Sequence, residues 1–98
     1  MKQHELKTWG QYFQAIVSGE KTFELRKNDR DYQVGDKLLL KEYNLLGITY
    51  VTQEMKGEYT GAEQMVEVTY ILKHEPMKNN FGLERGYCVM GIKKLNEW

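Results

Sequence analysis

Residues 19–26, which read GEKTFELR, hold the densest group of polar side chains in the sequence. Lys21 and Arg26 are hydrogen-bond donors, and the carboxylate of Glu24 between them is a strong acceptor. Brought together, these three side chains could read the edge of a nucleobase or hold a phosphate. The simpler alternative is a solvated strand face, on which Glu24 and Arg26 form an exposed ion pair worth less than about 1 kcal/mol.

The spacing within this segment predicts how a strand over residues 21–27 would orient its side chains. A two-residue period places Glu24 and Arg26 on one face, and it favours Phe23 and Leu25 on the opposite face, against the core. Lys21 is out of step with the other two polar residues. It can join them only from the turn before the strand or from a bulge, where the alternation of side chains is released.

An amphipathic helix over residues 9–18 should precede this strand. Its apolar positions recur three and four residues apart, Thr8 is placed to cap its start, and Gly19 is placed to end it. The stripe consists of Trp9, Tyr12, Phe13, Ile16 and Val17. Such a stripe must pack on another layer, so the rest of the chain should supply a sheet.

Further strands are predicted from alternating or leucine-rich patterns at residues 37–43, 65–73 and 87–95. Residues 74–86 contain the only proline, Pro76, and read as a loop that is either functional or merely a connection. Residues 44–56 could form a strand or an extended hairpin tip, and their apolar content could also serve a protein partner. One early helix and about five strands predict an α+β domain with a curled, partly closed sheet.

Gly19, Lys21, Glu24 and Arg26 reproduce a G-x-K-x-x-E-x-R signature, and in this the chain resembles the ASCH family of the PUA-like superfold, in particular a subgroup from bacteria and phages. The similarity covers most of the sequence, including residues 4–7, 28–30, 34–36, 57–61 and 68–72. The resemblance implies a single domain over residues 1–98, a small PUA-like mixed β-barrel with one main N-terminal helix. It also implies a cleft beside that helix, lined by the signature residues, that binds RNA, a nucleotide or a modified nucleobase.

The same family includes small bacterial hydrolases of N4-acylated cytidines, which use a Lys and a Thr from the signature segment. Here Glu24 stands where those enzymes have the Thr, and a carboxylate cannot replace an activated hydroxyl without a change of mechanism. Thr22 is displaced by roughly 6–7 Å along the strand, too far to inherit the attack geometry. We therefore expect a binding module. Were the chain an amidohydrolase, Lys21 would be its base and the nucleophile would be unknown.

Three residues outside the signature are further candidates for ligand binding. Trp9 could stack on a base, although a residue of a helix stripe more often packs in the core. Lys7, on the strand before the helix, and Arg85, at the end of the long loop, could reach a phosphate, and a solvated loop arginine is the alternative for Arg85. Cys88 lies in an apolar run and reads as a core residue.

Composition limits the choice of partner. The 98 residues carry 14 basic and 14 acidic side chains, so a neutral chain offers no general attraction to a polyanion, and any binding of nucleic acid must be local. The single cysteine and two histidines do not form a zinc motif, and we expect no metal or cofactor. The sequence shows no membrane span and no signal peptide, which makes the cytoplasm the expected location.

Overall fold

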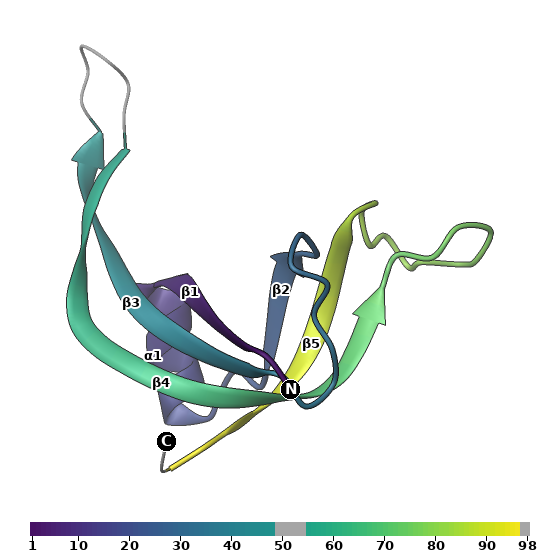
Figure 1. Ribbon diagram of the computed structural model, residues 1–98. Coiled ribbons are helices and arrows are strands. Elements are labelled where there is room, and N and C mark those ends of the chain that lie inside the picture. Colours follow the sequence, from purple (N-terminus) through teal and green to yellow (C-terminus); the bar gives the residue numbers. More distant parts are fainter. Residues whose placement is uncertain (49–54, 97–98) are drawn as a thin grey trace.

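The computed structural model describes residues 1–48 and 55–96 as one helix and five strands (Figure 1). In chain order these are β1 (Gln3–Trp9), α1 (Gly10–Ser18), β2 (Phe23–Lys27), β3 (Lys37–Ile48), β4 (Met55–Lys73) and β5 (Tyr87–Lys94). The predicted α+β class and number of strands are confirmed. No helix within these residues is long and apolar enough to cross a membrane.

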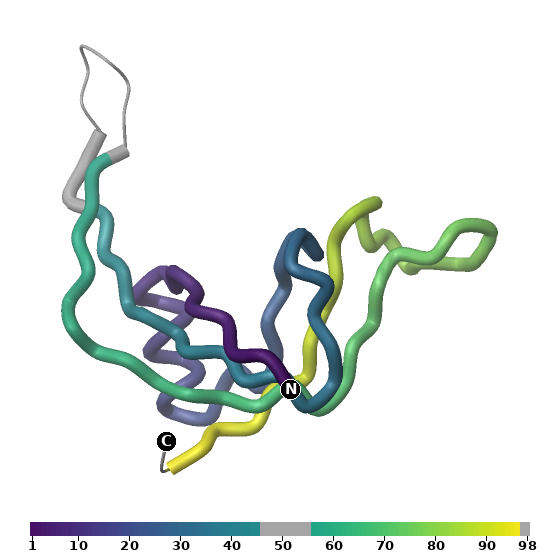
Figure 2. The backbone as a smooth tube through the Cα atoms, viewed as in Figure 1, coloured from purple at the N-terminus to yellow at the C-terminus, as the bar shows by residue number. Residues whose placement is uncertain are grey.

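The five strands form one mixed sheet in the order β1-β3-β4-β5-β2. β1 runs parallel to β3, and the other neighbours are antiparallel. β4 is long enough to pair with β3 along its first part and with β5 along its last part, so the sheet curls around it into a half-barrel (Figure 2). The curling leaves β1 and β2 as the two edges, which approach each other beside α1 (Figure 1).

Helix α1 begins and ends by different means. The prediction that Thr8 caps its start is wrong, because Thr8 is still in β1 and its hydroxyl donates to the carbonyl of Leu6 at 3.3 Å. The helix begins directly after Trp9 with no side-chain cap. Its end at Gly19 is as predicted: this glycine has a φ of 87°, a left-handed conformation that residues with a Cβ rarely adopt, and its N–H donates to the carbonyl of Ile16.

The core lies between α1 and the inner face of the sheet. Phe13 and Ile16 are the buried residues of the helix stripe, whereas Tyr12 and Val17 are exposed. The strands contribute a continuous set of buried apolar side chains: Leu6, Leu38, Leu40, Val66, Val68, Cys88, Met90 and Ile92. The interpretation of Cys88 as a core residue is therefore confirmed.

The prediction that Phe23 and Leu25 face the core is wrong. They are 47% and 56% exposed, whereas Glu24 is only 3% exposed and faces inward. The strand period is as predicted, but the two faces are exchanged. This is possible because two cations neutralise Glu24, which removes most of the cost of burying its charge.

The two long connections differ. Residues 74–86 form a loop of turns, as predicted, and it projects from the sheet at the end of β4 (Figure 2). Within residues 44–56, both ends are paired strand, with Leu45 opposite Gly57 and Ile48 opposite Met55. Residues 49–54 lie outside the described residues, so a partner surface on this segment stays a prediction.

Candidate functional site

Lys21, Glu24 and Arg26 converge where α1 leads into β2, as the position of the signature at a helix-to-strand junction predicted. The ammonium of Lys21 donates to one carboxylate oxygen of Glu24 at 2.7 Å, and Nε of Arg26 donates to the other at 2.8 Å. Lys21 reaches Glu24 from the turn before the strand, where its backbone N–H donates to the carbonyl of Ala15. We call these three residues the triad.

Arg26 also connects the two edges of the sheet. Its Nη2 donates to the backbone carbonyl of Lys7 at 2.8 Å and to the hydroxyl of Thr8 at 3.1 Å, both in β1. Arg30 acts in a similar way, since its Nη1 donates to the carbonyl of Glu5 at 2.9 Å. Two guanidinium groups thus donate hydrogen bonds to backbone carbonyls along the edge of β1 that does not pair with β3. These bonds hold β1 close to β2 and the segment that follows it.

A cavity of about 430 Å³ opens above the triad. Its size falls within the roughly 300–1,000 Å³ typical of small-molecule sites. The wall is formed by Thr8, Trp9, Tyr12, Lys21, Phe23, Glu24, Leu25 and Arg26. Three of these are aromatic, and the Lys21 ammonium lies 5.6 Å from the ring of Tyr12 and 4.9 Å from that of Phe23.

The hydrogen bonds determine what the triad can still offer a ligand. Both oxygens of Glu24 accept from its neighbours, so the carboxylate positions Lys21 and Arg26 and is largely occupied as an acceptor. Among the described residues, Nη1 of Arg26 meets no acceptor, and Lys21 uses two of its three N–H groups, on Glu24 and on the carbonyl of Phe23. The ionised triad has one excess positive charge. It therefore suits an acceptor such as a carbonyl or phosphate oxygen.

The other three candidate residues are placed differently. Trp9 lines the cavity, whereas the ammonium of Lys7 lies over the ring of Tyr43 at 4.3 Å, and only the backbone carbonyl of Lys7 contacts the triad. Arg85 is exposed in the turn before β5 and is not part of the cavity wall. The structure thus does not bring Lys7 or Arg85 into this site with their side chains.

Sequence reasoning missed four residues of the wall: Phe23 and Leu25, which were expected in the core, and Tyr12 and Thr8. Tyr12 belongs to the predicted apolar stripe of the helix, but its side chain is half exposed and lines the cavity. A phenol suits such a position because its ring is apolar and its hydroxyl can contact water. Thr8 was assigned to a helix cap, but its hydroxyl is an acceptor for Arg26. A hydroxyl within the β1 alternation of buried residues was the available signal for Thr8.

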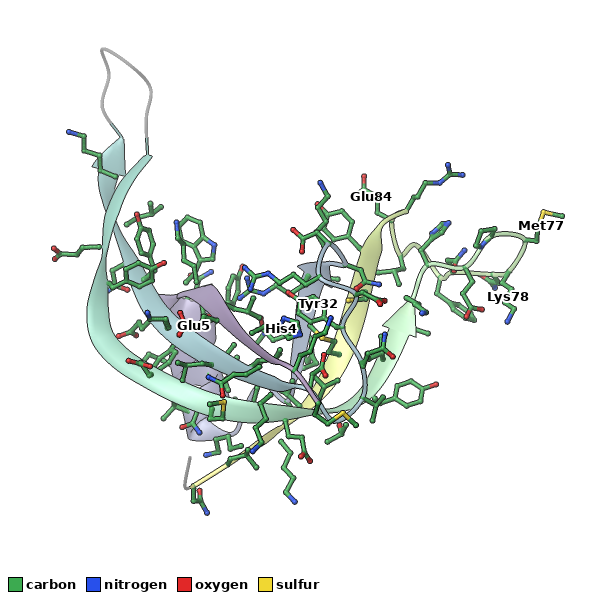
Figure 3. The ribbon with its side chains drawn as sticks, viewed as in Figure 1. His4, Glu5, Tyr32, Met77, Lys78 and Glu84 are labelled. Carbon is green, nitrogen blue, oxygen red and sulfur yellow. The ribbon has the colours of Figure 1, made fainter. Side chains whose placement is uncertain are left out.

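Two other chemically reactive groups, the His4–Asp36 pair and the Cys88 thiol, lie outside the cavity wall and have structural roles. His4 donates from Nε2 to Asp36 at 3.0 Å, and its ring packs edge-on against Tyr32 (Figure 3). Burial raises the pKa of the Asp36 carboxyl, but hydrogen bonds from His4 and from the backbone N–H groups of Gln33 and Lys2 outweigh it and hold the pKa below its usual value. Burial raises the pKa of Cys88, which leaves this thiol without the features of a nucleophile.

Within the described ranges, no three metal-ligating side chains gather at one place. The fold and site define a small curled-sheet protein with an aromatic-walled cavity over a buried carboxylate and two cations.

Comparison with known proteins places the chain in a family. Residues 3–92 match the family described as a domain of unknown function, DUF3850, and the chain belongs to this family. It is also similar to the uncharacterised 12.9 kDa protein in the GpA 3′ region of Escherichia phage P2, with 34% identity over 68 residues. That match covers 69% of this chain and 52% of the phage protein, so the chain spans about half of its relative.

Proposed function

We propose that the protein is an ASCH-like, PUA-like binding module that takes RNA, a nucleotide or a modified nucleobase into the cavity above the triad, and that it works in the cytoplasm. One observation carries the proposal. Lys21 and Arg26 are held in fixed directions by the buried Glu24, while N–H groups of both remain available beside aromatic walls. Donors fixed before binding lose little entropy when a ligand arrives.

A nucleotide matches each part of this arrangement. Its carbonyl or phosphate oxygens accept from the guanidinium and ammonium groups, and the planar base can stack on Trp9, Tyr12 or Phe23. The excess positive charge of the triad is local, which agrees with a chain of zero formal charge. Recognition would then rest on a few directed bonds and stacking.

The arrangement of elements supports the PUA-like assignment. A mixed, curled five-stranded sheet has its helix inserted between β1 and β2, and the signature residues lie beside that helix. The hydrolase alternative has less support. Lys21 donates to Glu24 and to the carbonyl of Phe23, and a base would have to leave these contacts before it could accept a proton. We expect no turnover of N4-acetylcytidine.

Titration calorimetry with the four nucleoside monophosphates, their nucleosides and N4-acetylcytidine tests the proposal. The informative variants are Lys21→Gln and Arg26→Lys, since lysine keeps the charge of Arg26 but loses the planar fork. Each should weaken binding of the preferred compound about tenfold or more.

Arg85→Ala is the matched control, because Arg85 is a cation outside the cavity wall. Circular dichroism establishes that each variant is folded at the titration temperature. Binding of none of these compounds at millimolar concentration, or equal affinities for wild type and Arg26→Lys, would remove the cavity as a nucleotide site.

A further inference from the structure

The sheet face that points away from the core carries an uncovered apolar surface. On β2, β5 and β4 the paired residues form rows, because directly opposite residues share a face. One row contains Phe23, Gly91 and Tyr70, and the next contains Leu25, Val89 and Leu72. We call these two rows, together with Tyr87 opposite Lys27, the outer face.

The large apolar side chains that β2 and β4 contribute to the outer face are exposed to solvent, although the opposite face of the sheet carries buried residues. Tyr70 is 66% exposed and Leu72 is 48% exposed, while the alternate residues of β5 are buried in the core. A contiguous group of large apolar side chains on a strand face marks a binding surface more often than chance exposure does. This also gives a reason for the outward orientation of Phe23 and Leu25.

Charge indicates what kind of partner this surface takes. By the strand register this face carries two basic residues, Lys27 and Lys93, and one acidic residue, Glu67, which lies opposite Lys93. It thus has one excess positive charge in a chain that is neutral as a whole. Lys27 and Lys93 follow the same strand alternation as the two rows of the outer face, and both are exposed. Aromatic rings on a sheet with basic residues beside them are the pattern by which proteins stack and neutralise single-stranded nucleic acid.

The outer face is continuous with the cavity. β2 is an edge strand, and Phe23 and Leu25 belong both to the first two rows and to the cavity wall. A base that stacks on Phe23 lies roughly 10 Å, or two strand spacings, from Tyr70. A single nucleotide in the cavity therefore does not reach Tyr70, whereas the next nucleotides of a strand would.

We propose that the ligand is a single-stranded oligonucleotide, one nucleotide of which enters the cavity while its neighbours stack across the outer face toward Tyr70. This inference rests on the proposed function and narrows its ligand class. It assigns separate roles to two regions: the triad selects one nucleotide, and the outer face supplies the affinity that depends on length.

The experiment compares probes of different length on the full chain. Fluorescence anisotropy measures binding of labelled nine-residue oligouridylate and oligodeoxythymidylate, and competition measures UMP. Tyr70→Ala should weaken oligonucleotide binding five- to a hundredfold, the range found for loss of one stacked base, and leave UMP binding unchanged. Tyr59→Ala is the matched control, because Tyr59 is another exposed tyrosine of β4 but lies in its first part, opposite Tyr43.

The basic residues are tested by salt dependence. Lys27→Gln combined with Lys93→Gln should reduce the slope of log K against log salt by about 1.4, since each phosphate contact on a single strand contributes about 0.7. Lys56→Gln, an exposed lysine in the first part of β4 where that strand pairs with β3, serves as the charge control. The RNA and DNA probes distinguish the two forms of the same ligand chemistry.

The outcomes separate the two proposals. Oligonucleotides that bind no tighter than UMP, or that are insensitive to Tyr70→Ala, overturn this inference and leave the cavity as a nucleotide site. Oligonucleotide binding that is lost in Tyr70→Ala but is unaffected by Arg26→Lys supports the outer face and refutes the proposed role of the triad. A dimer in sedimentation that Tyr70→Ala dissociates would show that a second copy covers this face, and it would also overturn the inference.

Discussion

Replacement of Glu24 by Gln is the most direct test of whether the buried triad stabilises the fold. Glu24 is almost fully buried and accepts one charge-assisted hydrogen bond from Lys21 and one from Arg26. A glutamine carbonyl can keep one of these bonds in neutral form, at a loss of about 1 kcal/mol. Its amide places a donor against the other cation, which loses a bond worth about 1.5–3 kcal/mol.

The full sum is reduced because Lys21 and Arg26 are partly exposed and can recruit water. We therefore expect Glu24→Gln to lower the free energy of unfolding by about 2–3 kcal/mol, and the melting temperature by roughly 8–24 °C for a domain of this size.

Urea unfolding followed by circular dichroism measures the change at constant slope. Glu63→Gln, on the exposed part of β4, is the matched control and should change the stability by less than about 0.5 kcal/mol. A loss below about 1 kcal/mol for Glu24→Gln would mean that the triad behaves as an ordinary solvated ion pair. The burial argument would then be wrong.

The remaining expectations compare Arg26 with Arg85 and concern the Asp36 carboxylate and the Cys88 thiol. Arg26→Lys should weaken nucleotide binding about tenfold or more by calorimetry, and Arg85→Ala should change it less than twofold; equal losses would contradict the geometry. The pKa of Asp36 is lower in the folded protein than its unfolded value of 3.8, so the ionised carboxyl stabilises the fold above that value, and this stabilisation is lost as pH falls through the folded pKa. Asp36→Asn should therefore flatten the dependence of the free energy of unfolding on pH between about pH 5 and 2. Urea titrations at several pH values measure it, and an unchanged profile would refute the argument. Cys88 is fully buried with a raised pKa, so iodoacetamide should label it at the rate of unfolding, and rapid labelling of the native protein by mass spectrometry would contradict the core assignment.

Much of the fold could be predicted because its elements have clear periods and ends. The helix end follows from Gly19, whose positive φ few other residues tolerate, and β5 follows from strict alternation around Cys88, Met90 and Ile92. The bounds of β1 could not be predicted in this way. Its buried positions include His4 and Thr8, which are polar and acquire partners only from Asp36 and Arg26 far along the chain. A hydropathy pattern takes no account of hydrogen-bond partners that lie far away in the sequence.

The members of the triad were predictable, but the orientation of the strand that carries Glu24 and Arg26 was not, and neither was the rest of the cavity wall. Strand alternation determines that Glu24 and Arg26 share a face, and that Phe23 and Leu25 share the other. It does not determine which face is buried, because that depends on what packs there. Hydropathy favours burial of Phe23 over burial of an unpaired charged Glu24, but the ion pair that Lys21 makes from the preceding turn changes that balance. Spacing along one strand could not supply that contact.

The geometry of Arg26 explains why an arginine suits this position better than a lysine. A guanidinium has five N–H groups in a fixed plane, and here Nε serves Glu24 while Nη2 serves β1 through the carbonyl of Lys7 and the hydroxyl of Thr8. Within the part of the chain that the structure describes, no acceptor meets the two N–H groups of Nη1, so they could serve a ligand. One side chain can thus hold the edges of the sheet together and bind an acceptor at the same time, without exchanging one contact for the other. A lysine has three N–H groups on a single atom, so it could not direct bonds to Glu24, β1 and a ligand in three separate directions, and the stability of the sheet and the occupancy of the cavity would compete.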